Sequence, residues 1–597
     1  MSETAGGSPA QTDAAAALGE AGRGGPRRLV IVGAVAAGTS VGAKARRNDE
    51  GMEIVVYERD QDISYSGCGL PYYIGGQVDD EDVLHPRDPA WFAARYNIDI
   101  RTRHEVIGVD HDARRLTVRN LATGQEFTDG YDTLVLATGA RSIVPPVPGS
   151  DLPGVFALRN VRDAVAIRDW IEARQPDRAV VVGSGFIGLE VAEQLVERGL
   201  QVTLVERLPQ VLPALDADMA FRVEETLTSH GVDVRVGTSV TALTNNETSL
   251  AGVTGVTGAI LDAGEHLEAG LVILAVGVRP NVELARQLGA DLGPSGAIGV
   301  DTSMRTSVPD VYAVGDCAES FSAITGASLW RPLGSTANKM GRIAGEVISG
   351  GTLSHRGILG TGILRVFEMG VAYTGLTETE ARAQAFDVVV LHNIKPAHAT
   401  YLNGRQIVIK AIADRATGRL LGAQAIGPEG VDKRIDVLAT AITFGATAAD
   451  LFHLDLAYSP PFATTKDPVH YTGMALDTAI RGRAPLITPE ALEARVAAGE
   501  HLQIVDVRSA SDYAKSHVPG AQHIPLKALR HRLNELDPTR ATITYCNSGV
   551  SGNAAQNVLL ASGFQEVSNL SGGNNNYQTH LRQIQAHPAG PARGVSK

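Results

Sequence analysis

The chain has 597 residues, enough for three or four domains of about 100–200 residues each. Hydrophobic residues make up 44 % and charged residues 20 %, which excludes both a disordered chain and a membrane protein. The formal net charge of −13 argues against a nucleic acid or an anionic membrane as the partner. The 65 glycines and only three cysteines favour a cytoplasmic α/β enzyme without a disulfide framework or a metal site.

The first 26 residues form a distinct segment. Residues 1–26 are rich in Ala, Gly, Ser and Thr and carry too little apolar surface to fold, which predicts a disordered tail. Arg27 and Arg28, before an apolar stretch, resemble a twin-arginine export signal. The stretch LVIVGAVAAG has instead the pattern of a strand, a glycine-rich turn and a helix start. We therefore expect a cytoplasmic protein, and no apolar run reaches the roughly 18 residues of a membrane-spanning helix.

A pattern of strand, glycine-rich turn and helix occurs twice. LVIVGAVAAG places Gly33 and Gly38 at the first and last positions of G-x-G-x-x-G, with Val35 at the middle position. AVVVGSGFIG carries all three glycines: Gly183, Gly185 and Gly188. An acidic residue ends the next strand in each case, Glu58 in EIVVYE and Glu206 in QVTLVE. Because this spacing is typical of dinucleotide sites, the repeat predicts two bound dinucleotides.

The chemistry of such a site explains the residue types. Glycines let the backbone approach a pyrophosphate, the helix N-terminus favours its charge, and the carboxylate binds ribose hydroxyls. Two dinucleotides in one chain usually mean a flavin and a nicotinamide. Glu206 favours NADH, because a carboxylate repels the 2′-phosphate of NADPH; Arg207 beside it could accept that phosphate, so NADPH stays open.

Three later stretches are typical of strands that end beside a cofactor. YDTLVLATGA ends in Ala-Thr-Gly, with Ala137 and Gly139, and LVILAVGVRPN contains Gly277. TSVPDVYAVGDCA places Asp316 at the end of a strand, where it would face a polyol. A helix N-cap is the alternative for Asp316, since Ala318 and Glu319 could begin a helix.

These motifs resemble the pyridine nucleotide–disulfide oxidoreductase family over roughly residues 28–475. The resemblance implies that the first fingerprint binds FAD, the second binds NAD(P)H, and Asp316 binds the FAD ribityl chain. It also implies two Rossmann-like α/β domains and an α+β dimerisation domain, with active sites completed across a homodimer. The implied boundaries are 27–150 and 281–350 for FAD, 151–280 for NAD(P)H, and 351–478 for dimerisation.

The segment DISYSGCGLPYYIGG contains a candidate redox cysteine, Cys68, between Gly67 and Gly69. The flanking glycines would let a planar ring or a thiol substrate approach the sulfur. If a helix begins at Leu70, its positive end would lower the pKa of the thiol. A buried structural cysteine is the alternative and suits Cys317 better. With no second cysteine nearby, the sulfur must pair with another molecule or be oxidised to sulfenic acid.

This single-cysteine pattern is similar to the coenzyme A-disulfide reductases and their NADH oxidase and peroxidase relatives. The resemblance implies that Tyr401 and Tyr458 reach the cysteine sulfur from the partner subunit, where their hydroxyls would protonate a leaving thiolate. The implied coenzyme A contacts are Ser40, Lys44, Arg47, Ser64, Gly67 and Lys466. Lys44 and Arg47 share a helix face that could pair with phosphates or could simply be solvated.

The last part of the chain is a separate unit. After a linker at 479–487, residues 488–590 resemble an α/β rhodanese domain. The residues that match its framework are Asp506, Arg508, His517, Gly520 and Pro525. Cys546 opens a Gly/Ser loop before a helix, which favours an anionic thiolate or persulfide. The loop arginines of active rhodaneses are missing, so either Cys546 carries sulfane sulfur or the domain is inactive.

Together these features predict an FAD-dependent NAD(P)H reductase of coenzyme A disulfide, coenzyme A persulfide or polysulfide. We expect the reaction to proceed through a mixed disulfide between Cys68 and coenzyme A, and Cys546 to deliver sulfane sulfur. Two alternatives remain open. One is an NADH oxidase or peroxidase that cycles Cys68 through sulfenic acid, and the other is a redox or sulfur sensor.

Overall fold

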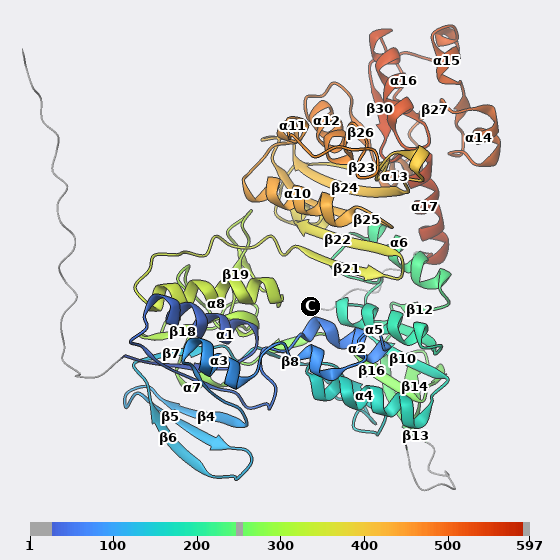
Figure 1. Cartoon of the computed structure of the whole chain (residues 1–597). Helices are drawn as coiled ribbons and strands as arrows, with labels where there is room; N and C mark the ends of the chain where they lie inside the picture. Colours follow the sequence, from blue (N-terminus) through green and yellow to red (C-terminus); the bar gives the residue numbers. More distant parts are fainter. Residues whose placement is uncertain (1–26, 246–254, 589–597) are drawn as a thin grey trace, which may run out of the picture.

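The computed structural model describes residues 27–245 and 255–588. These residues form four consecutive regions, each built around a five-stranded sheet (Figure 1). The tail predicted at 1–26 and the last two residues of the predicted rhodanese segment lie outside the described residues. Within the described ranges, no helix is both long and apolar enough to cross a membrane.

The first region contains a parallel sheet with the first fingerprint at its centre. Its strand order is β18 (Val311–Ala313), β7 (Thr133–Leu136), β1 (Arg28–Val32), β2 (Glu53–Tyr57) and β3 (Asp99–Arg101). Helices α1 (Ala36–Asn48) and α8 (Gly334–Ile348) pack together, since a Cβ on Gly341 would lie only 2.4 Å from the Ala37 carbonyl oxygen. The antiparallel strands β4 (His104–Asp110), β5 (Arg115–Asn120) and β6 (Glu126–Gly130) form an added sheet.

The second region repeats this arrangement. Its parallel order is β12 (Asp233–Val236), β11 (Gln201–Glu206), β10 (Arg178–Val182), β16 (Leu271–Leu274) and β9 (Val155–Ala157). Its helices are α4 (Val161–Arg174), α5 (Phe186–Glu197) and α6 (Ala217–Ser229), and its antiparallel strands are β13 (Val240–Asn245), β14 (Val256–Leu261) and β15 (His266–Glu268). The pair β8 (Ala140–Ser142) and β17 (Val278–Pro280) joins the two regions. Both nucleotide-binding regions are therefore Rossmann-like, as predicted.

The third region is an antiparallel sheet with helices packed on it. The strand order is β21 (Gly362–Val366), β22 (Met369–Gly375), β25 (Leu420–Gly427), β24 (Gln406–Asp414) and β23 (Val388–Pro396), so β23 is an edge strand. Its helices are α9 (Glu378–Ala383), α10 (Val431–Thr443), α11 (Ala448–Phe452) and α12 (Pro468–Ile480). An antiparallel sheet with separate helices is the α+β arrangement that the resemblance implies for this part of the chain.

The fourth region is a small parallel sheet with helices around it. The order is β26 (Leu486–Ile487), β30 (Val567–Leu570), β29 (Thr542–Tyr545), β27 (Gln503–Asp506) and β28 (Gln522–His523). The helices are α13 (Pro489–Ala497), α14 (Ala510–Lys515), α15 (Leu526–Leu529), α16 (Val550–Ala561) and α17 (Gly573–Ala586). The alternation of strands and helices predicted for this segment is confirmed.

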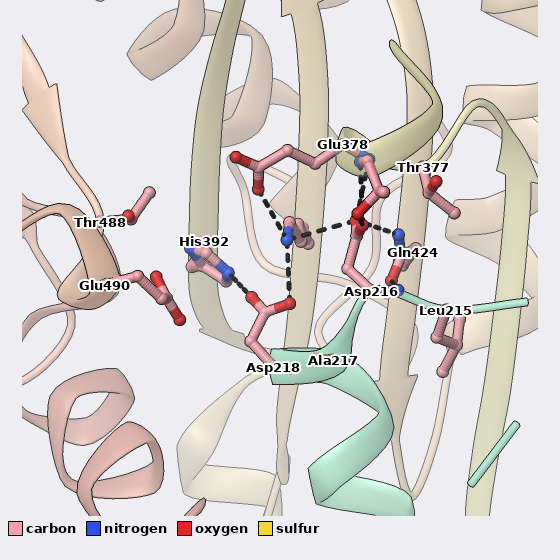
Figure 2. A network of polar contacts seen from close by, with 12 residues as sticks. Leu215, Asp216, Ala217, Asp218, Thr377, Glu378, His392, Gln424, Thr488 and Glu490 are labelled. Atoms are coloured by element: carbon pink, nitrogen blue, oxygen red, sulfur yellow. Dashed lines mark hydrogen bonds and ion pairs between the residues drawn. The ribbon is translucent and has the colours of Figure 1, made fainter. Parts of the chain in front are cut away.

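The fourth region docks on both the second and the third. Figure 1 shows α17 alongside α6, where Arg582 pairs with Glu225 at 2.6 Å. Beside this contact lies a buried ion-pair cluster, in which Figure 2 shows Asp216, Asp218 and Glu378 from two regions converging. The Lys410 ammonium on β24 pairs with all three carboxylates, at 3.2, 2.9 and 2.9 Å. Separating the second and third regions would leave buried charges without partners, which is energetically costly. The cluster therefore fixes the position of these two regions relative to each other.

Candidate functional site

The turn between β1 and α1 accepts only small residues at two positions. Gly33 has a φ of 109°, and a Cβ on it would lie 2.2 Å from the Ala137 carbonyl oxygen. A Cβ on Gly38 would lie 1.8 Å from the Gly33 carbonyl oxygen. The turn therefore brings the start of α1 directly against the ends of β1 and β7, as a pyrophosphate site requires.

Glu58 follows β2 at the edge of the same turn. Its carboxylate accepts hydrogen bonds from the backbone N–H groups of Ala34 at 2.8 Å and Asp60 at 2.9 Å. Burial raises the pKa of the Glu58 carboxyl group from its ordinary value. Each oxygen keeps a lone pair free, so the carboxylate is fixed where a ribose hydroxyl can donate to it.

Asp316 follows β18, a strand that is distant from the first fingerprint in the sequence but belongs to the same sheet. It lies in a short 3₁₀ turn, Gly315–Cys317, and its carboxylate pairs with the Arg159 guanidinium at 3.1 Å. The residues after it continue into β19 (Ser320–Phe321), so the helix N-cap alternative is wrong. The sequence analysis missed Arg159, because a lone arginine between two motifs carries no local signal. Gly139, at a φ of 63°, lies next to this guanidinium.

The second fingerprint has the same geometry as the first. Cβ atoms on Gly183 and Gly188 would lie 2.4 and 2.0 Å from backbone oxygens, whereas Gly185 faces open space at the start of α5. The Glu206 carboxylate accepts hydrogen bonds from both the N–H and the hydroxyl of Ser184, at 2.9 and 2.7 Å. Gly277, at a φ of 106°, follows β16 at the same edge of the sheet. This edge therefore holds all five residues predicted for the nicotinamide dinucleotide.

Cys68 lies in a 3₁₀ turn, Gly67–Gly69, that leads into the short helix α2 (Leu70–Gly75). The residue is exposed. The Ser64 N–H donates to the Ala34 carbonyl oxygen at 3.0 Å, and Ser64 adopts a φ of 48°. This bond ties the cysteine loop to the first fingerprint, so the sulfur and the first dinucleotide site belong to one structural unit.

The charge around Cys68 differs from the expectation. Burial of the sulfur atom by its surroundings, followed by the carboxylates of Glu190 and Asp316, raises the pKa of the Cys68 thiol. The expected lowering by a helix N-terminus is therefore wrong for this chain taken alone. The helix has only six residues, so its dipole is weak, and burial of the sulfur, followed by the two carboxylates, acts in the opposite direction.

Glu190 is the second residue that the sequence analysis missed. It lies on α5, two residues after Gly188, and accepts a hydrogen bond from the Tyr72 hydroxyl at 3.4 Å. Burial raises the pKa of Glu190 to about 7, so it exchanges a proton near neutral pH. Its position just after the second fingerprint, near a predicted cofactor site, could have been read from the sequence. Its approach to Cys68 could not, because that depends on the fold.

The two predicted tyrosines lie on two loops of the third region that are in contact, and both are exposed. The Ala399 N–H donates to the Pro460 carbonyl oxygen at 3.1 Å, which joins their two loops. Tyr401 is 75 % and Tyr458 51 % exposed, and neither hydroxyl is hydrogen-bonded to Cys68 within the described chain. The structure of one chain therefore joins the loops that carry the tyrosines, and neither tyrosine hydroxyl is bonded to the sulfur within the described residues.

The six residues predicted to bind coenzyme A lie in three places: the Cys68 loop, helix α1, and the segment before α12 that contains Lys466. Ser64 and Gly67 lie in the Cys68 loop, whereas Ser40, Lys44 and Arg47 lie on α1. The Lys44 ammonium pairs with Glu346 at 2.5 Å, and the Arg47 guanidinium lies 5.8 Å from the centre of the Tyr96 ring. The Ser40 hydroxyl donates to Asn338 at 2.7 Å, and the Lys466 ammonium lies 5.9 Å from the Tyr471 ring centre. The basic face of α1 is thus already partnered within the chain.

The other two cysteines have contrasting surroundings. The Cys317 thiol is fully buried and donates to the carbonyl oxygens of Leu136 and Val314, both at 3.3 Å, which confirms a structural role. Cys546 follows β29 and is 7 % exposed, and its Sγ accepts a hydrogen bond from the Gly549 N–H at 3.2 Å. The loop around Cys546 thus cradles the sulfur with a backbone amide.

The sequence matches three protein-family models. Pyridine nucleotide-disulphide oxidoreductase matches 27–332, the dimerisation domain of the same family matches 363–468, and the rhodanese-like domain matches 488–580. The chain belongs to the pyridine nucleotide-disulphide oxidoreductase family. The predicted fold class and the predicted C-terminal rhodanese fold of this oxidoreductase are thereby confirmed.

Three relatives of the oxidoreductase show how far the similarity extends. The NAD(P)H sulfur oxidoreductase (CoA-dependent) of Pyrococcus furiosus is 40 % identical over 74 % of this chain and 97 % of its own length. The structure of reduced Bacillus anthracis CoADR-RHD is 37 % identical, with a TM-score of 0.90 over 94 % of this chain and 99 % of that one. The NAD-dependent persulfide reductase of A. fulgidus is 35 % identical, with a TM-score of 0.84 over 92 % and 100 %.

FAD and NAD(P)H are the cofactors of this family, and the residues of the chain fit both. The close approaches at Gly33 and Gly183 leave no space for a side chain, as backbone contact with a pyrophosphate requires. Glu58 and Glu206 are each held by two backbone N–H donors at equivalent positions. Glu58 would hold the FAD ribose, and Glu206 that of the nicotinamide dinucleotide.

Proposed function

We propose that this oxidoreductase uses NADH to reduce the S–S bond of coenzyme A disulfide, coenzyme A persulfide or a related polysulfide at Cys68. The observation that carries this proposal is the single exposed cysteine tied to the first dinucleotide site. The other two cysteines, Cys317 and Cys546, are buried elsewhere, so the sulfur that pairs with Cys68 must come from a substrate. The names of the relatives supply coenzyme A and persulfide as its chemical context.

The reaction balances as two steps. The Cys68 thiolate attacks coenzyme A persulfide, forms the Cys68–S–S–CoA bond and releases HS⁻; with coenzyme A disulfide it releases the coenzyme A thiolate instead. FAD, which Gly33, Gly38 and Glu58 of the first fingerprint would hold, would supply the transfer of two electrons from NADH to the mixed disulfide. NADH and the mixed disulfide thus give NAD⁺, H⁺ and the two thiolates of Cys68 and coenzyme A. Glu190 lies close enough to Cys68 to influence its charge and exchanges a proton near neutral pH.

The active site is completed by a second chain in this proposal. Tyr401 and Tyr458 form an exposed pair in the dimerisation domain, and exposed Phe444 and Phe462 lie in the same domain. An interface between two chains would remove these large apolar side chains from water. In a homodimer, the tyrosine hydroxyls of the second chain would donate to the thiolate leaving from Cys68.

Coenzyme A binding is assigned to Ser64 and Gly67 beside the sulfur and to the polar face of α1, with Lys466 contributed by the dimerisation domain. The α1 residues are Ser40, Lys44 and Arg47. Because Lys44 already pairs with Glu346, a phosphate would have to share or displace that carboxylate. The preference for NADH follows from Glu206, whose fixed carboxylate repels a 2′-phosphate.

The rhodanese domain supplies sulfane sulfur in this scheme. The Cys546 thiolate attacks a persulfide R–S–SH, which gives Cys546–S–SH and RS⁻, and the coenzyme A thiolate then removes the outer sulfur. Support comes from the Gly549 N–H that faces the sulfur and from persulfide reductase activity in the name of a relative that matches the full length. The loop after Cys546 contains no arginine, so its backbone N–H groups would have to stabilise the persulfide anion.

The test compares NADH oxidation with coenzyme A disulfide, coenzyme A persulfide, polysulfide, hydrogen peroxide and oxygen in one assay. We expect rapid turnover with the S–S acceptors and a coenzyme A adduct on the Cys68 peptide in mass spectrometry of the non-reduced protein. Cys317→Ala is the matched control and should retain both results, because Cys317 is structural. Rapid oxidation with oxygen or peroxide alone would indicate an oxidase or peroxidase, and no turnover with any acceptor would indicate a sensor.

A further inference from the structure

The loop that carries Cys546 is held by the first residues of α17. The Asn574 N–H donates to the Cys546 carbonyl oxygen at 2.8 Å, and the Asn575 N–H donates to the Asn547 carbonyl oxygen at 3.0 Å. Asn574 and Asn575 are the second and third residues of α17, and the first N–H groups of a helix have no acceptor within it. Because the loop supplies these acceptors, the position of the loop depends on the position of this end of α17.

The N-termini of two helices meet at this loop. α16 begins at Val550, directly after Gly549, whose N–H donates to the Cys546 Sγ at 3.2 Å. α17 begins at Gly573, and a Cβ on that residue would lie 2.3 Å from the Cys546 carbonyl oxygen. Helix N-termini favour negative charge within their first turn, so both helices favour an anionic sulfur on Cys546. A displacement of α17 would weaken this stabilisation.

A Ser-Gly-Gly segment, residues 571–573, lies between the cysteine loop and β23 of the dimerisation domain. On one side, Gly573 approaches the Cys546 carbonyl group as described above. On the other side, a Cβ on Gly572 would lie 3.1 Å from the His392 Cβ on β23. Both glycines have a positive φ, 72° at Gly572 and 61° at Gly573, which favours glycine at these positions. The segment is thus in direct contact with the edge strand and with the loop at once.

Ser571, the first residue of this segment, is bonded to His392 on β23. Its hydroxyl oxygen accepts a hydrogen bond from the His392 N–H at 2.7 Å, and the His392 Nδ1 lies 3.2 Å from the same oxygen. Both residues are 1 % exposed, so water does not compete for these bonds. The rhodanese domain is therefore bonded to the dimerisation domain only three residues before Asn574, which holds the cysteine loop.

The other nitrogen of the His392 ring is bonded to the nucleotide-binding region. Figure 2 shows the ring facing Asp218 of α6, whose carboxylate bonds to the His392 Nε2 and pairs with the Lys410 ammonium at 2.9 Å. Burial by itself would raise the pKa of the Asp218 carboxyl group, but Lys410 and His392 hold it well below its ordinary value, so the carboxylate stays ionised. Because an ionised carboxylate holds Nε2, the ring is fixed with Nδ1 directed at Ser571.

We propose that His392 of the dimerisation domain is a positioning residue for the sulfur carrier: through Ser571 it holds the N-terminus of α17 against the loop of Cys546. The proposal rests on the sulfur-carrying role proposed for Cys546. In that step the Cys546 thiolate attacks the outer sulfur of R–S–SH, the S–S bond breaks, and RS⁻ leaves. The loop must keep the Gly549 N–H directed at an anionic sulfur before and after the transfer. Docking on the reductase therefore sets the conformation in which the loop can do so.

The test compares Ser571→Ala, His392→Ala and the double variant with wild type, all as full-length holoenzyme. In Ser571→Ala, hydrogen exchange at the amides of Asn574 and Asn575 should speed up about tenfold, because a buried hydrogen bond changes an equilibrium by up to about that factor. The pH profile of Cys546 alkylation by iodoacetamide should move up by about half a pH unit, since the loop no longer favours the anion as strongly. The double variant should show no more than the effect of Ser571→Ala, because both substitutions break the same contact.

Two further variants serve as conservative replacement and control. Ser571→Thr keeps the hydroxyl and should recover most of the wild-type exchange rate and pH profile. Ser562→Ala is the matched control, because the Ser562 hydroxyl lies at the exposed end of α16 and donates to the Val558 carbonyl oxygen at 2.7 Å. It should leave both measurements unchanged.

A second measurement separates this proposal from the proposed function. Transfer of sulfur from an alkyl persulfide to coenzyme A should fall about tenfold in Ser571→Ala relative to NADH-dependent reduction of coenzyme A disulfide, and Ser571→Thr should restore the ratio. Wild-type amide exchange and an unshifted pH profile in both Ser571→Ala and His392→Ala would overturn the positioning role, whatever the enzyme transfers. A wild-type protein that forms no persulfide on Cys546 overturns the sulfur-carrying role, while the exchange rates and the pH profile still decide whether His392 positions the loop.

Discussion

The two chemically active cysteines have opposite surroundings. Cys68 is exposed, and the carboxylates nearest to it, Glu190 and Asp316, disfavour its thiolate. Cys546 is buried, and the Gly549 backbone N–H donates a hydrogen bond to its sulfur. A single chain thus encloses the sulfur of Cys546, whereas the sulfur of Cys68 is open to the second chain and the substrate that we propose to act there.

The substitution with the largest expected effect distinguishes the role of Cys68 from that of Cys546. Cys68→Ser should lower NADH-dependent reduction of coenzyme A disulfide by about a thousandfold or more, because the mixed disulfide is no longer formed. The same variant should still take up sulfur on Cys546 from an alkyl persulfide, as measured by mass spectrometry. Full reductase activity in Cys68→Ser would remove the proposed mechanism.

The next largest effect tests whether tyrosines of a second chain act at Cys68. The double variant Tyr401→Phe/Tyr458→Phe should lose about a hundredfold in the rate of coenzyme A disulfide reduction, since it lacks both proton donors. After subunits are exchanged with Cys68→Ser, heterodimers should regain one complete site, giving up to about a quarter of wild-type activity in a symmetric dimer. Recovery of no activity, in a mixture shown to contain heterodimers, would place the tyrosines and the sulfur in one chain.

A smaller effect tests the negative charge at Cys68. With its pKa raised to about 7, Glu190 is mostly neutral at about pH 6 and mostly ionised at about pH 8. Glu190→Gln should therefore speed alkylation of Cys68 severalfold at about pH 8 and leave it nearly unchanged at about pH 6. Cys546 in the same sample serves as the internal control. An equal change at both pH values would show that the substitution acts through packing rather than charge.

The smallest effect concerns how firmly the rhodanese domain is held. Arg582 and Glu225 form a half-exposed ion pair between α17 and α6, and such pairs contribute about 0–1 kcal/mol. Arg582→Ala should change the alkylation rate of Cys546 by less than about twofold and leave that of Cys68 unchanged. A large loss at Cys546 would mean that this surface pair, rather than the buried contacts of β23, positions the loop.

Local patterns predicted most of the fold and part of the site. The two fingerprints, their acids and the strands after them occur as predicted, because glycine spacing and β-branched runs are local signals. The sign of the pKa shift at Cys68 could not be predicted, since Glu190 and Asp316 approach it only through the fold. The same holds for Glu346, the partner of Lys44 on α8. The domain boundaries and the roles of the site residues stay predictions.

The contact between Ser571 and β23 has a consequence for the solubility of the protein. β23 is the last strand of its sheet, and the outward N–H of His392 is satisfied by the rhodanese domain. A chain shortened to end after α12 would expose this long apolar strand along its open side. Uncovered strand edges pair with one another, so the shortened enzyme should aggregate even if its redox chemistry survives. The sulfur-carrier domain therefore also acts as a cover that keeps the sheet from recruiting further strands.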